Sequence, residues 1–317
     1  MGILRMFKKI RKWVIFLTLL SVLIVFFFPS EKVKEWTCAY KIGQNYCRIL
    51  IQMADDKKEY DKEKKYLEIS ARYGNPVAQR QLGLMYGIDL VEKDYQKSIY
   101  WLKKSLEHNE DKLSLAALGY YYKNGLGVEQ DYVKAFELLR KSAEKGYDIA
   151  QFELGSMYAY GLGVESNDVK AVEWYRKSAE QGNANAQLSL GFMYTKGRGV
   201  KQDYEQANQW FKKSADQNNA QAQYNLGVSY DHGSGVEQNY KIAFQWYKKA
   251  AEQEYADAQH NIGVMYEYGK GVEKNLTKAK EYYQKAYNYY QKACINGVGA
   301  EKSCERLKEL SNSIKRL

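Results

Sequence analysis

Proline is scarce in this chain, with two residues, Pro29 and Pro76, among 317. Because proline interrupts helices, this scarcity fits an array of helices, and thirty tyrosines supply aromatic rings for the layers between them. The mean hydropathy of −0.63, with 27% charged residues, indicates that the bulk of the chain is soluble.

Metal-binding and acid–base motifs are also missing. The three histidines, His108, His232 and His260, lie outside any H-E-x-x-H motif or carboxylate cluster, and the four cysteines lack the C-x2-C spacing of zinc sites. His232 precedes Gly233 at a predicted helix end, where a histidine commonly bonds to carbonyl groups. We therefore expect no catalytic, cofactor-binding or metal-binding residue.

A dense basic stripe is absent beyond the N-terminus. The formal net charge is +10, and five lysine and arginine residues within residues 1–12 supply half of it. Residues 13–317 share the other half. Such a mild excess is typical of solvated helix faces, so we expect no nucleic-acid partner.

One long apolar run is present, at residues 13–28, and it carries no charge. A helix of this segment is roughly 24 Å long, slightly less than the bilayer core of about 30 Å, and Trp13 and the preceding lysines can extend it. A cleaved secretory signal is the alternative, but it needs small residues at −3 and −1, which residues 26–32 do not supply. The sequence favours an uncleaved transmembrane signal anchor.

Charge predicts the orientation of this anchor. Five positive charges precede it, whereas the charges of Glu31, Lys32, Lys34 and Glu35 after it cancel. By the positive-inside rule, residues 1–12 form a cytoplasmic tail and the rest of the chain lies outside. We expect a single-pass protein of the inner membrane, with residues 29–317 periplasmic or extracellular.

The cysteines form two close pairs near the ends of the chain, Cys38 with Cys47 and Cys294 with Cys304. Spacings of nine and ten residues with glycine between suit two helix ends joined by a short turn, which brings Cα atoms to the roughly 5.5 Å of a disulfide. Two bridges agree with an oxidising compartment. Free buried thiols and a zinc site are the alternatives.

A 36-residue period dominates the remaining sequence, with glycine after a branched apolar residue and tyrosine three residues later. A fixed period of this length is typical of a solenoid of stacked units. The glycines are Gly83, Gly119, Gly155, Gly191, Gly227 and Gly263, and the tyrosines are Tyr86, Tyr122, Tyr158, Tyr194, Tyr230 and Tyr266.

Each period predicts a pair of helices. In one unit, residues 184–196 carry apolar side chains at helical spacing, Gly197 suits a left-handed helix cap, and Asp203 is placed to cap the second helix, residues 204–217. Paired glycines and a valine recur in five of these turns, whereas the first full unit reads Gly-Ile-Asp-Leu-Val at 87–91, lacks the second glycine and is one residue shorter. The pattern A-x-A-Q-x-x-L-G-x-M-Y-x-x-G-x-G-V-x-x-D-Y-x-x-A-x-x-W-Y-x-K-A-A-E-x-G resembles the Sel-one-like repeat (SLR) family, over roughly residues 45–310.

This resemblance implies an all-α, right-handed α/α superhelical solenoid of about six helix pairs, related to tetratricopeptide arrays, whose concave face holds protein partners. We expect an N-terminal capping unit at 29–74, regular repeats at 75–281, and an extended C-terminal helix and cap at 282–317. The sequence Tyr-Tyr-Gln-Lys-Ala occurs twice, at 282–286 and 289–293, which predicts about two extra helical turns. The cysteine pairs resemble the cysteine-rich branch of the family, in which a bridge ties successive helices.

Two sequence matches suggest chemistry but fit the repeat better. The G-x-G-V turns have no following G-K-[ST] and no preceding strand, so they indicate helix caps rather than a phosphate site. Ser142 and Lys145 match S-x-x-K of penicillin-interacting enzymes, yet K-S-A-E-x-G is the repeat consensus and no K-T-G or S-D-N motif accompanies it.

Positions that vary between repeats are the candidates for recognition. In each first helix they lie two residues before the glycine, one after it and five after it, and we expect them to form a partner-binding variable strip on the concave face. The alternative is that these positions lie on a solvated face and vary because nothing constrains them. The residues of the variable strip are Tyr120, Asn124, Glu153, Tyr160, Phe192, Lys196, Asn225, His232, Asn261 and Tyr268.

The hypothesis from the sequence is thus a non-catalytic, membrane-anchored scaffold whose partner is a protein, such as a secreted toxin or an envelope complex. The resemblance suggests a sharper alternative, an immunity protein that neutralises a secreted antibacterial effector such as a phospholipase. A hydrolase of β-lactam or cell-wall substrates, of the cysteine-rich SLR type, is the least favoured alternative.

Overall fold

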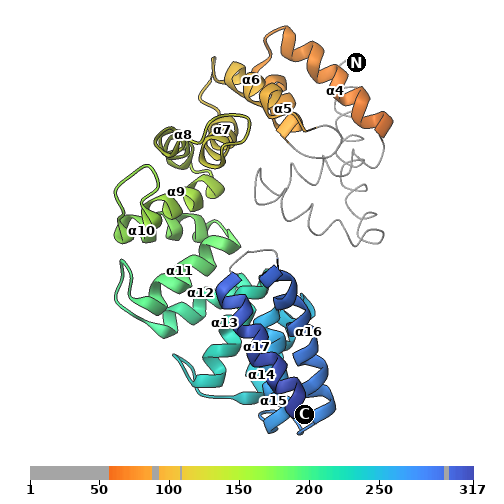
Figure 1. Cartoon of the computed structure of the whole chain (residues 1–317). Helices are drawn as coiled ribbons and strands as arrows, with labels where there is room; N and C mark the ends of the chain where they lie inside the picture. Colours follow the sequence, from red (N-terminus) through yellow and green to blue (C-terminus); the bar gives the residue numbers. More distant parts are fainter. Residues whose placement is uncertain (1–56, 88–92, 108, 296–299) are drawn as a thin grey trace, which may run out of the picture. The chain divides into compact units, whose positions relative to one another are not determined.

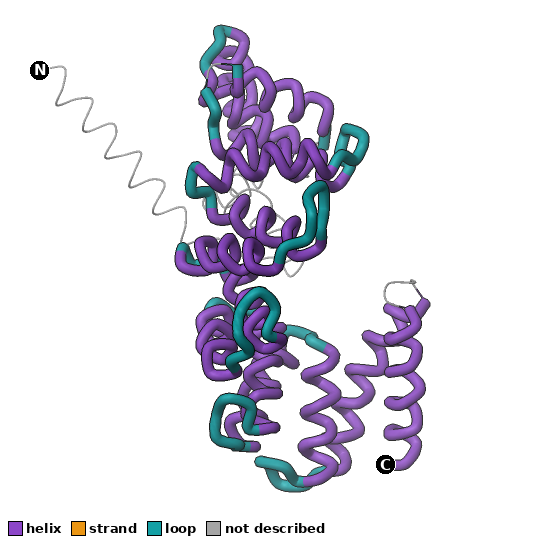
Figure 2. Tube along the Cα trace, turned by 90° about the vertical axis from the view of Figure 1, so that its left-hand side faces the viewer, coloured by secondary structure: helices purple, strands orange, loops and turns teal. Residues whose placement is uncertain are grey.

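The computed structural model describes residues 57–87, 93–107, 109–295 and 300–317. Within these residues the regular elements are fourteen α-helices, α4 to α17, joined by short loops and without any strand (Figures 1 and 2). The prediction of an all-α chain is confirmed for this part. The predicted tail 1–12, the predicted anchor 13–28, and Cys38 and Cys47 lie outside it.

The helices fall into two units, which divide between Ser166 and Asn167. The helices of the first unit are α4 (Lys57–Arg72), α5 (Pro76–Gly87), α6 (Tyr95–Leu106), α7 (Lys112–Asn124), α8 (Tyr132–Glu144) and α9 (Asp148–Tyr160). Those of the second are α10 (Asp168–Glu180), α11 (Ala184–Lys196), α12 (Tyr204–Asp216), α13 (Ala220–His232), α14 (Tyr240–Glu252), α15 (Ala256–Tyr268), α16 (Leu276–Ile295) and α17 (Ala300–Arg316).

Odd-numbered helices from α5 to α15 are the first helices of the repeats, and we call them A helices; even-numbered helices from α6 to α16 are B helices. Asp203 caps α12 by accepting a hydrogen bond from the Gln206 amide at 2.9 Å, and Gly197 ends α11 with φ of 65°. Both caps confirm the predictions for this unit. The same pair of caps recurs at the 36-residue interval, so each repeat has one geometry.

The glycine inside each A helix is required by close helix packing. A Cβ atom at Gly263 would lie 2.6 Å from the Tyr283 ring on the B helix of the same pair. Small residues on the B helices serve the same contact: the alanines that recur on them are at most 1% exposed. They are Ala135, Ala171, Ala207, Ala243 and Ala279.

The second unit ends in a modified helix pair. The helix α16 has 20 residues, whereas α14 has 13, so the duplicated Tyr-Tyr-Gln-Lys-Ala lengthens the helix as predicted. Helix α17 packs against α16 and buries Leu310 completely, in a cluster with Ala286 and Tyr290. Its outer residues are polar, which suits a terminal cap.

Among the helices in the described part of the chain, none combines the length and the apolar character needed to cross a membrane.

Candidate functional site

The last residue of five A helices is exposed to solvent, immediately before the glycine that ends the helix. We call these residues, five after the repeat glycine, the tip residues: Asn124, Tyr160, Lys196, His232 and Tyr268. Tyr160 is 72% exposed and Tyr268 is 60% exposed. The tip residues therefore form the accessible part of the variable strip.

Two tip residues also complete the helix end. The Asn124 side-chain amide donates to the Tyr120 carbonyl at 2.8 Å, and the His232 Nδ1 lies 3.0 Å from the Val228 carbonyl. The last carbonyls of a helix have no intrahelical partner, so a polar side chain four residues on satisfies one of them. The expectation that His232 bonds to a carbonyl at a helix end is confirmed.

The strip positions two residues before the glycine lie between neighbouring A helices instead. Glu153 of α9 is 2% exposed, and Lys123 of α7 donates to its carboxylate at 2.5 Å. A charge this deeply buried is retained because it is paired. Glu153 therefore belongs to a seam between A helices, and its side chain is not available at the surface.

In the second unit the same seam holds amides and tyrosines. Asn225 and Asn261 are half-buried, and the Nδ2 of Asn225 has no hydrogen-bond partner in the structure. Asn261 lies near Tyr224 and Tyr247, and Tyr247 donates to Asp231 at 3.3 Å. Burial, followed by the charge of Asp231, raises the pKa of Tyr247.

The positions one residue after the glycine are partly covered. Phe192 packs edge-on against Phe211 of its own helix pair, with ring centroids 5.5 Å apart. Tyr120 is half-buried beside Tyr121, and burial raises its pKa, with the charge of Glu153 adding to the effect. These two residues contribute mainly to the core between helices, so the variable strip divides by position into exposed tips and a largely covered remainder.

Further polar contacts, which the sequence did not indicate, lie around Glu267 at the end of α15, where the seam gives way to the B helix α16 and the cap helix α17. This carboxylate is 7% exposed, and it accepts a hydrogen bond from Tyr283 at 2.7 Å and another from Arg316 of α17 at 2.6 Å. Burial and the hydrogen bond to Glu267 raise the pKa of Tyr283. Glu267 thereby joins α15, α16 and α17.

A signal for part of this seam was present in the sequence. Lys123 and Glu153 are 30 residues apart, and the same separation joins Gln217 to Gln187 and Gln253 to Gln223. A search for complementary side chains 30 residues apart would have found the Lys123 pair. The partner of Glu267 lies 49 residues away, since it comes from the cap, and such a search would miss it.

A second cluster fastens α17 to the last repeat. Tyr290 donates to Asp257 at 2.6 Å. The positive charge of Arg306 on α17 lies near both side chains and interacts with them. His260 packs on the Tyr283 ring at 5.5 Å between ring centroids, and its Nδ1 has no hydrogen-bond partner among the described residues. Burial, and then the positive charge of Arg306, lower the pKa of His260.

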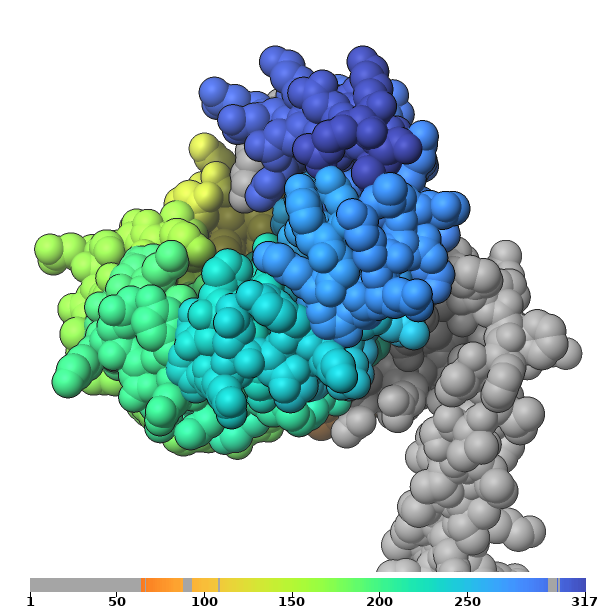
Figure 3. Space-filling view, turned by 90° about the horizontal axis from the view of Figure 1, so that it is seen from below, coloured from red at the N-terminus to blue at the C-terminus, as the bar shows by residue number. Residues whose placement is uncertain are grey.

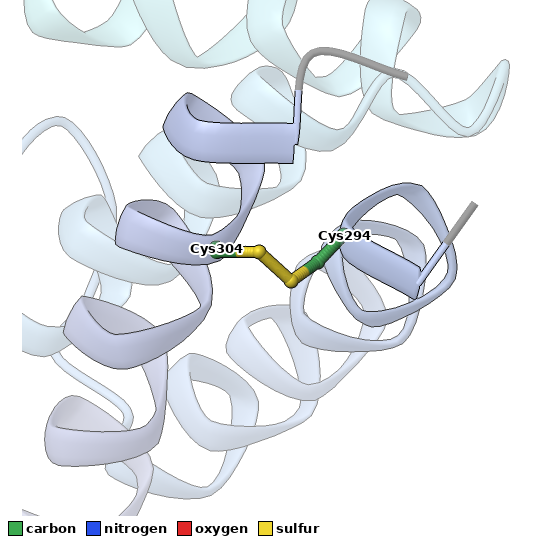
Figure 4. Close-up of a disulfide and its surroundings, with 2 residues drawn as sticks. All are labelled: Cys294 and Cys304. Atoms are coloured by element: carbon green, nitrogen blue, oxygen red, sulfur yellow. A yellow bond between two sulfur atoms is a disulfide. The ribbon is translucent and has the colours of Figure 1, made fainter. Parts of the chain in front are cut away.

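The disulfide Cys294–Cys304 is present and ties the last turn of α16 to the second turn of α17, with a Cα–Cα distance of 5.0 Å (Figure 4). The prediction of a bridge between two helix ends is confirmed for this pair. The bridge therefore ties the start of α17 covalently to α16, whereas Arg316 contacts Glu267 from the other end of α17.

The S-x-x-K match has no exposed nucleophile. Ser142 is fully buried, and its hydroxyl donates to the Lys112 carbonyl at 2.7 Å. Lys145 is on the surface and lies 3.3 Å from Glu110. Ser214, at the equivalent position two repeats later, makes the same kind of bond, to the Ala184 carbonyl. The Ser142 contact is thus a structural feature of the repeat.

Among the described residues, no group of three or more His, Cys, Asp or Glu side chains is arranged to hold a metal ion.

Pairs of short helices at a 36-residue period, each closed by the same two caps, define an α-solenoid repeat protein. The sequence model of the Sel1 repeat matches residues 76–110, 113–147, 148–183, 184–219, 220–255, 256–288 and 284–298. The chain belongs to the Sel1 repeat family, as the repeat pattern predicts. Proteins built of these repeats are generally non-catalytic scaffolds for protein–protein interaction.

Solved structures with this fold include bacterial proteins. One is c5321, a protective antigen present in uropathogenic Escherichia coli strains and displaying an SLR fold; it is 32% identical, with a TM-score of 0.68 over 80% of this chain and 56% of its own. Another is a Sel1 repeat protein from Oxalobacter formigenes, 29% identical, with a TM-score of 0.59 over 66% of this chain and 84% of its own.

A curated relative is the ERAD-associated E3 ubiquitin-protein ligase component HRD3B of Arabidopsis thaliana. It is 36% identical over 88 residues, which are 27% of this chain and 13% of the relative. The chain thus spans a small part of that relative's length and about half of the length of c5321.

Proposed function

We propose that this protein is a non-catalytic scaffold that binds a protein partner through its tip residues. The observation that carries the proposal is the exposure of Tyr160 and Tyr268 at positions where no two successive repeats share a residue. Packing holds the core positions constant, so variation combined with exposure is what selection for a particular partner would leave.

The chemistry of the tip residues suits such contacts. Tyrosine offers a large contact area with few rotatable bonds, so it loses little conformational entropy on binding, and it is enriched at the energetic centres of interfaces. Lys196 and His232 add donors at neighbouring tips. We propose that the tip residues contact a single protein partner. Glu153 supports this binding indirectly, by holding α9 against α7.

Photo-crosslinking tests this proposal. A photoreactive phenylalanine analogue would replace Tyr160 or Tyr268, and in matched controls it would replace Val133 or Val169, which are 59% and 56% exposed at the start of B helices. We expect one protein adduct of defined mass from the tip positions and little from the controls. Equal yields from both sets would contradict a binding role of the tips.

We further propose that residues 13–28 anchor the chain in the inner membrane and that the repeats face the periplasm or the exterior. The charge asymmetry around the apolar run supports this placement. The bridge Cys294–Cys304 supports it too, because disulfides persist mainly in oxidising compartments.

A narrower form of the proposal makes the partner a secreted antibacterial effector and the protein its immunity factor. It rests on the resemblance to anchored SLR proteins and on the predicted location. Deleting the gene should render the strain sensitive to kin that carry the neighbouring effector gene. Continued resistance after deletion would exclude the immunity role while leaving the scaffold proposal standing.

A further inference from the structure

Within the second unit, the B helices α14 and α16 concentrate lysine. Every lysine of both helices is exposed, and no arginine occurs in either. With only Glu252 and Glu281 as acidic residues, the two helices carry a net charge of +5. We call their lysines the lysine face: Lys241, Lys248, Lys249, Lys278, Lys280, Lys285 and Lys292.

This excess of positive charge distinguishes α14 and α16 from the B helices that precede them in the second unit. The preceding B helices α10 and α12 are each neutral, because three basic residues meet three acidic ones in α10 and two meet two in α12. Along the 36-residue register, Glu173 of α10 is followed by Gln209 and then by Gln245, and Asp168 is followed by Tyr204 and Tyr240. Lys177 is retained as Lys213 and then Lys249 while these two acids are replaced, so the charge concentrates on α14 and α16.

The lysines lie opposite the buried side of each helix. Helix α14 buries Ala243 and Tyr247, and α16 buries Ala279 and Tyr283, so the exposed lysines point outward. The two helices lie near each other, because Tyr282 of α16 packs against the hydrophobic cluster to which α14 contributes Tyr247 and Ala251. In the space-filling view the α13–α14 region (cyan) adjoins the α15–α16 region (blue) (Figure 3).

Few of these ammonium groups are neutralised by the residues that the structure describes. Lys285 pairs with Glu281 at 2.7 Å, and Lys248 lies 3.9 Å from Glu252. Lys249 lies over the Trp246 ring at 4.2 Å, which holds the side chain without cancelling its charge. The extension of α16 adds apolar groups beside the charge: Tyr289 is 54% exposed and Ile295 is 77% exposed.

We propose that the lysine face docks on a membrane surface that carries anionic phospholipid headgroups. Clustered lysines are attracted by the negative potential of such a surface, and exposed aromatic and aliphatic side chains enter its interfacial region. A nucleic acid fits less well, because arginine is missing from both helices and Trp246 lies half-buried under Lys249, where a base cannot stack on it.

The repeat offers internal controls for a test. Lys177 and Lys213 occupy the positions of Lys249 on α10 and α12, and they lie over Trp174 and Trp210 at 4.1 and 4.0 Å. These lysines have the same local chemistry as Lys249 but stand on neutral helices. The acetylation rates of Lys177 and Lys213 therefore show how fast such a lysine reacts near a vesicle when it does not belong to the lysine face.

The experiment is acetylation footprinting of the full-length protein, read by mass spectrometry, with phosphatidylglycerol vesicles and with phosphatidylcholine vesicles. We expect Lys249 and Lys285 to be acetylated several-fold more slowly in the presence of phosphatidylglycerol vesicles than in the presence of phosphatidylcholine vesicles. This protection should vanish in high salt. Lys177 and Lys213 should be acetylated at the same rate in the presence of either kind of vesicle. Because each comparison is made within one chain, attachment through residues 13–28 does not create the difference.

A variant sharpens the result. Combining Lys241→Gln, Lys280→Gln and Lys292→Gln should abolish the protection of Lys249, whereas combining Lys170→Gln, Lys177→Gln and Lys213→Gln should leave it. The proposal is overturned if α10 and α12 are protected as strongly as α14 and α16, or if neither lipid protects Lys249. Protection by a single-stranded oligonucleotide but not by vesicles would also overturn it, in favour of a nucleic-acid surface.

Discussion

Single residues at the seams hold neighbouring repeats in place, and Glu267 is the strongest example. Its carboxylate satisfies Tyr283 and Arg316 at once, although Arg316 is 60% exposed and water screens that ion pair. We expect Glu267→Ala to lower the free energy of unfolding by about 1–3 kcal/mol, since a buried hydroxyl loses its acceptor. Urea denaturation would measure the change.

Glu281→Ala is the matched control, because Glu281 pairs with Lys285 on the open surface. Its effect should stay within about 0.5 kcal/mol. Equal losses for the two variants would show that the burial of Glu267 does not matter for stability.

His260 makes stability depend on pH. Its pKa is lowered in the folded protein, so folding favours the neutral ring; this contribution is complete above the unfolded value of about 6.5 and is lost as pH falls through the folded pKa. We expect the urea midpoint of unfolding to decrease as the pH is lowered from 7 to 5. The variant His260→Gln should show a smaller decrease over the same range. His232→Gln, at an exposed tip, should keep the slope of the natural protein.

At the scale of elements, helix α17 depends on its bridge to α16. The chain-entropy model assigns about 2–3 kcal/mol to a disulfide that closes a loop of this length. In the double variant Cys294→Ser and Cys304→Ser, we expect hydrogen exchange to accelerate across α17 and the end of α16, where the cap opens. Helix α13 of the same unit should exchange as before, and unchanged exchange in α17 would show that its polar contacts suffice.

The helices were largely predictable because their determinants are local. Asp203 caps α12 and Gly197 ends α11 through contacts within a few residues, so the sequence pattern contains them directly. The extra length of α16 was predictable for the same reason, from its duplicated segment. The irregular turn expected after Gly87 falls largely in residues 88–92, outside the described residues.

The variable strip was predictable only in outline. Its members were chosen by variation, but exposure depends on where along the A helix each one lies. Glu153 and Tyr160 share one side of α9, yet Glu153 lies mid-helix, where it is buried against Lys123, and Tyr160 is the last residue of the helix and lies in solvent. A helical position does not reveal which of its neighbours will pack against it, and partner binding by the strip stays a prediction.

At the scale of the whole molecule, the location of the repeats can be tested directly. An alkaline phosphatase fusion after residue 60 should be active, because that enzyme needs the oxidising periplasm to form its disulfides. A fusion within residues 1–12 should be inactive. Activity restricted to the N-terminal fusion would reverse the orientation that the positive-inside rule predicts.

Overall composition concealed the distribution of charge. Counted over the chain, the basic excess outside residues 1–12 is mild, and it predicted no basic stripe. Within the second unit, α14 and α16 nevertheless carry a net charge of +5 on their outer sides. The right-handed superhelical course of the array remains a prediction from the family resemblance.

The sequence by itself determined the repeat, its two helices, their caps and the family, because the contacts that produce them recur every 36 residues. Only the tertiary structure decided which variable residues are exposed, which side chain holds Glu267, and that seven lysines face outward from α14 and α16. The physical reason is that a helix has several sides. Spacing along the chain tells which residues share a side, and packing alone tells which side meets water.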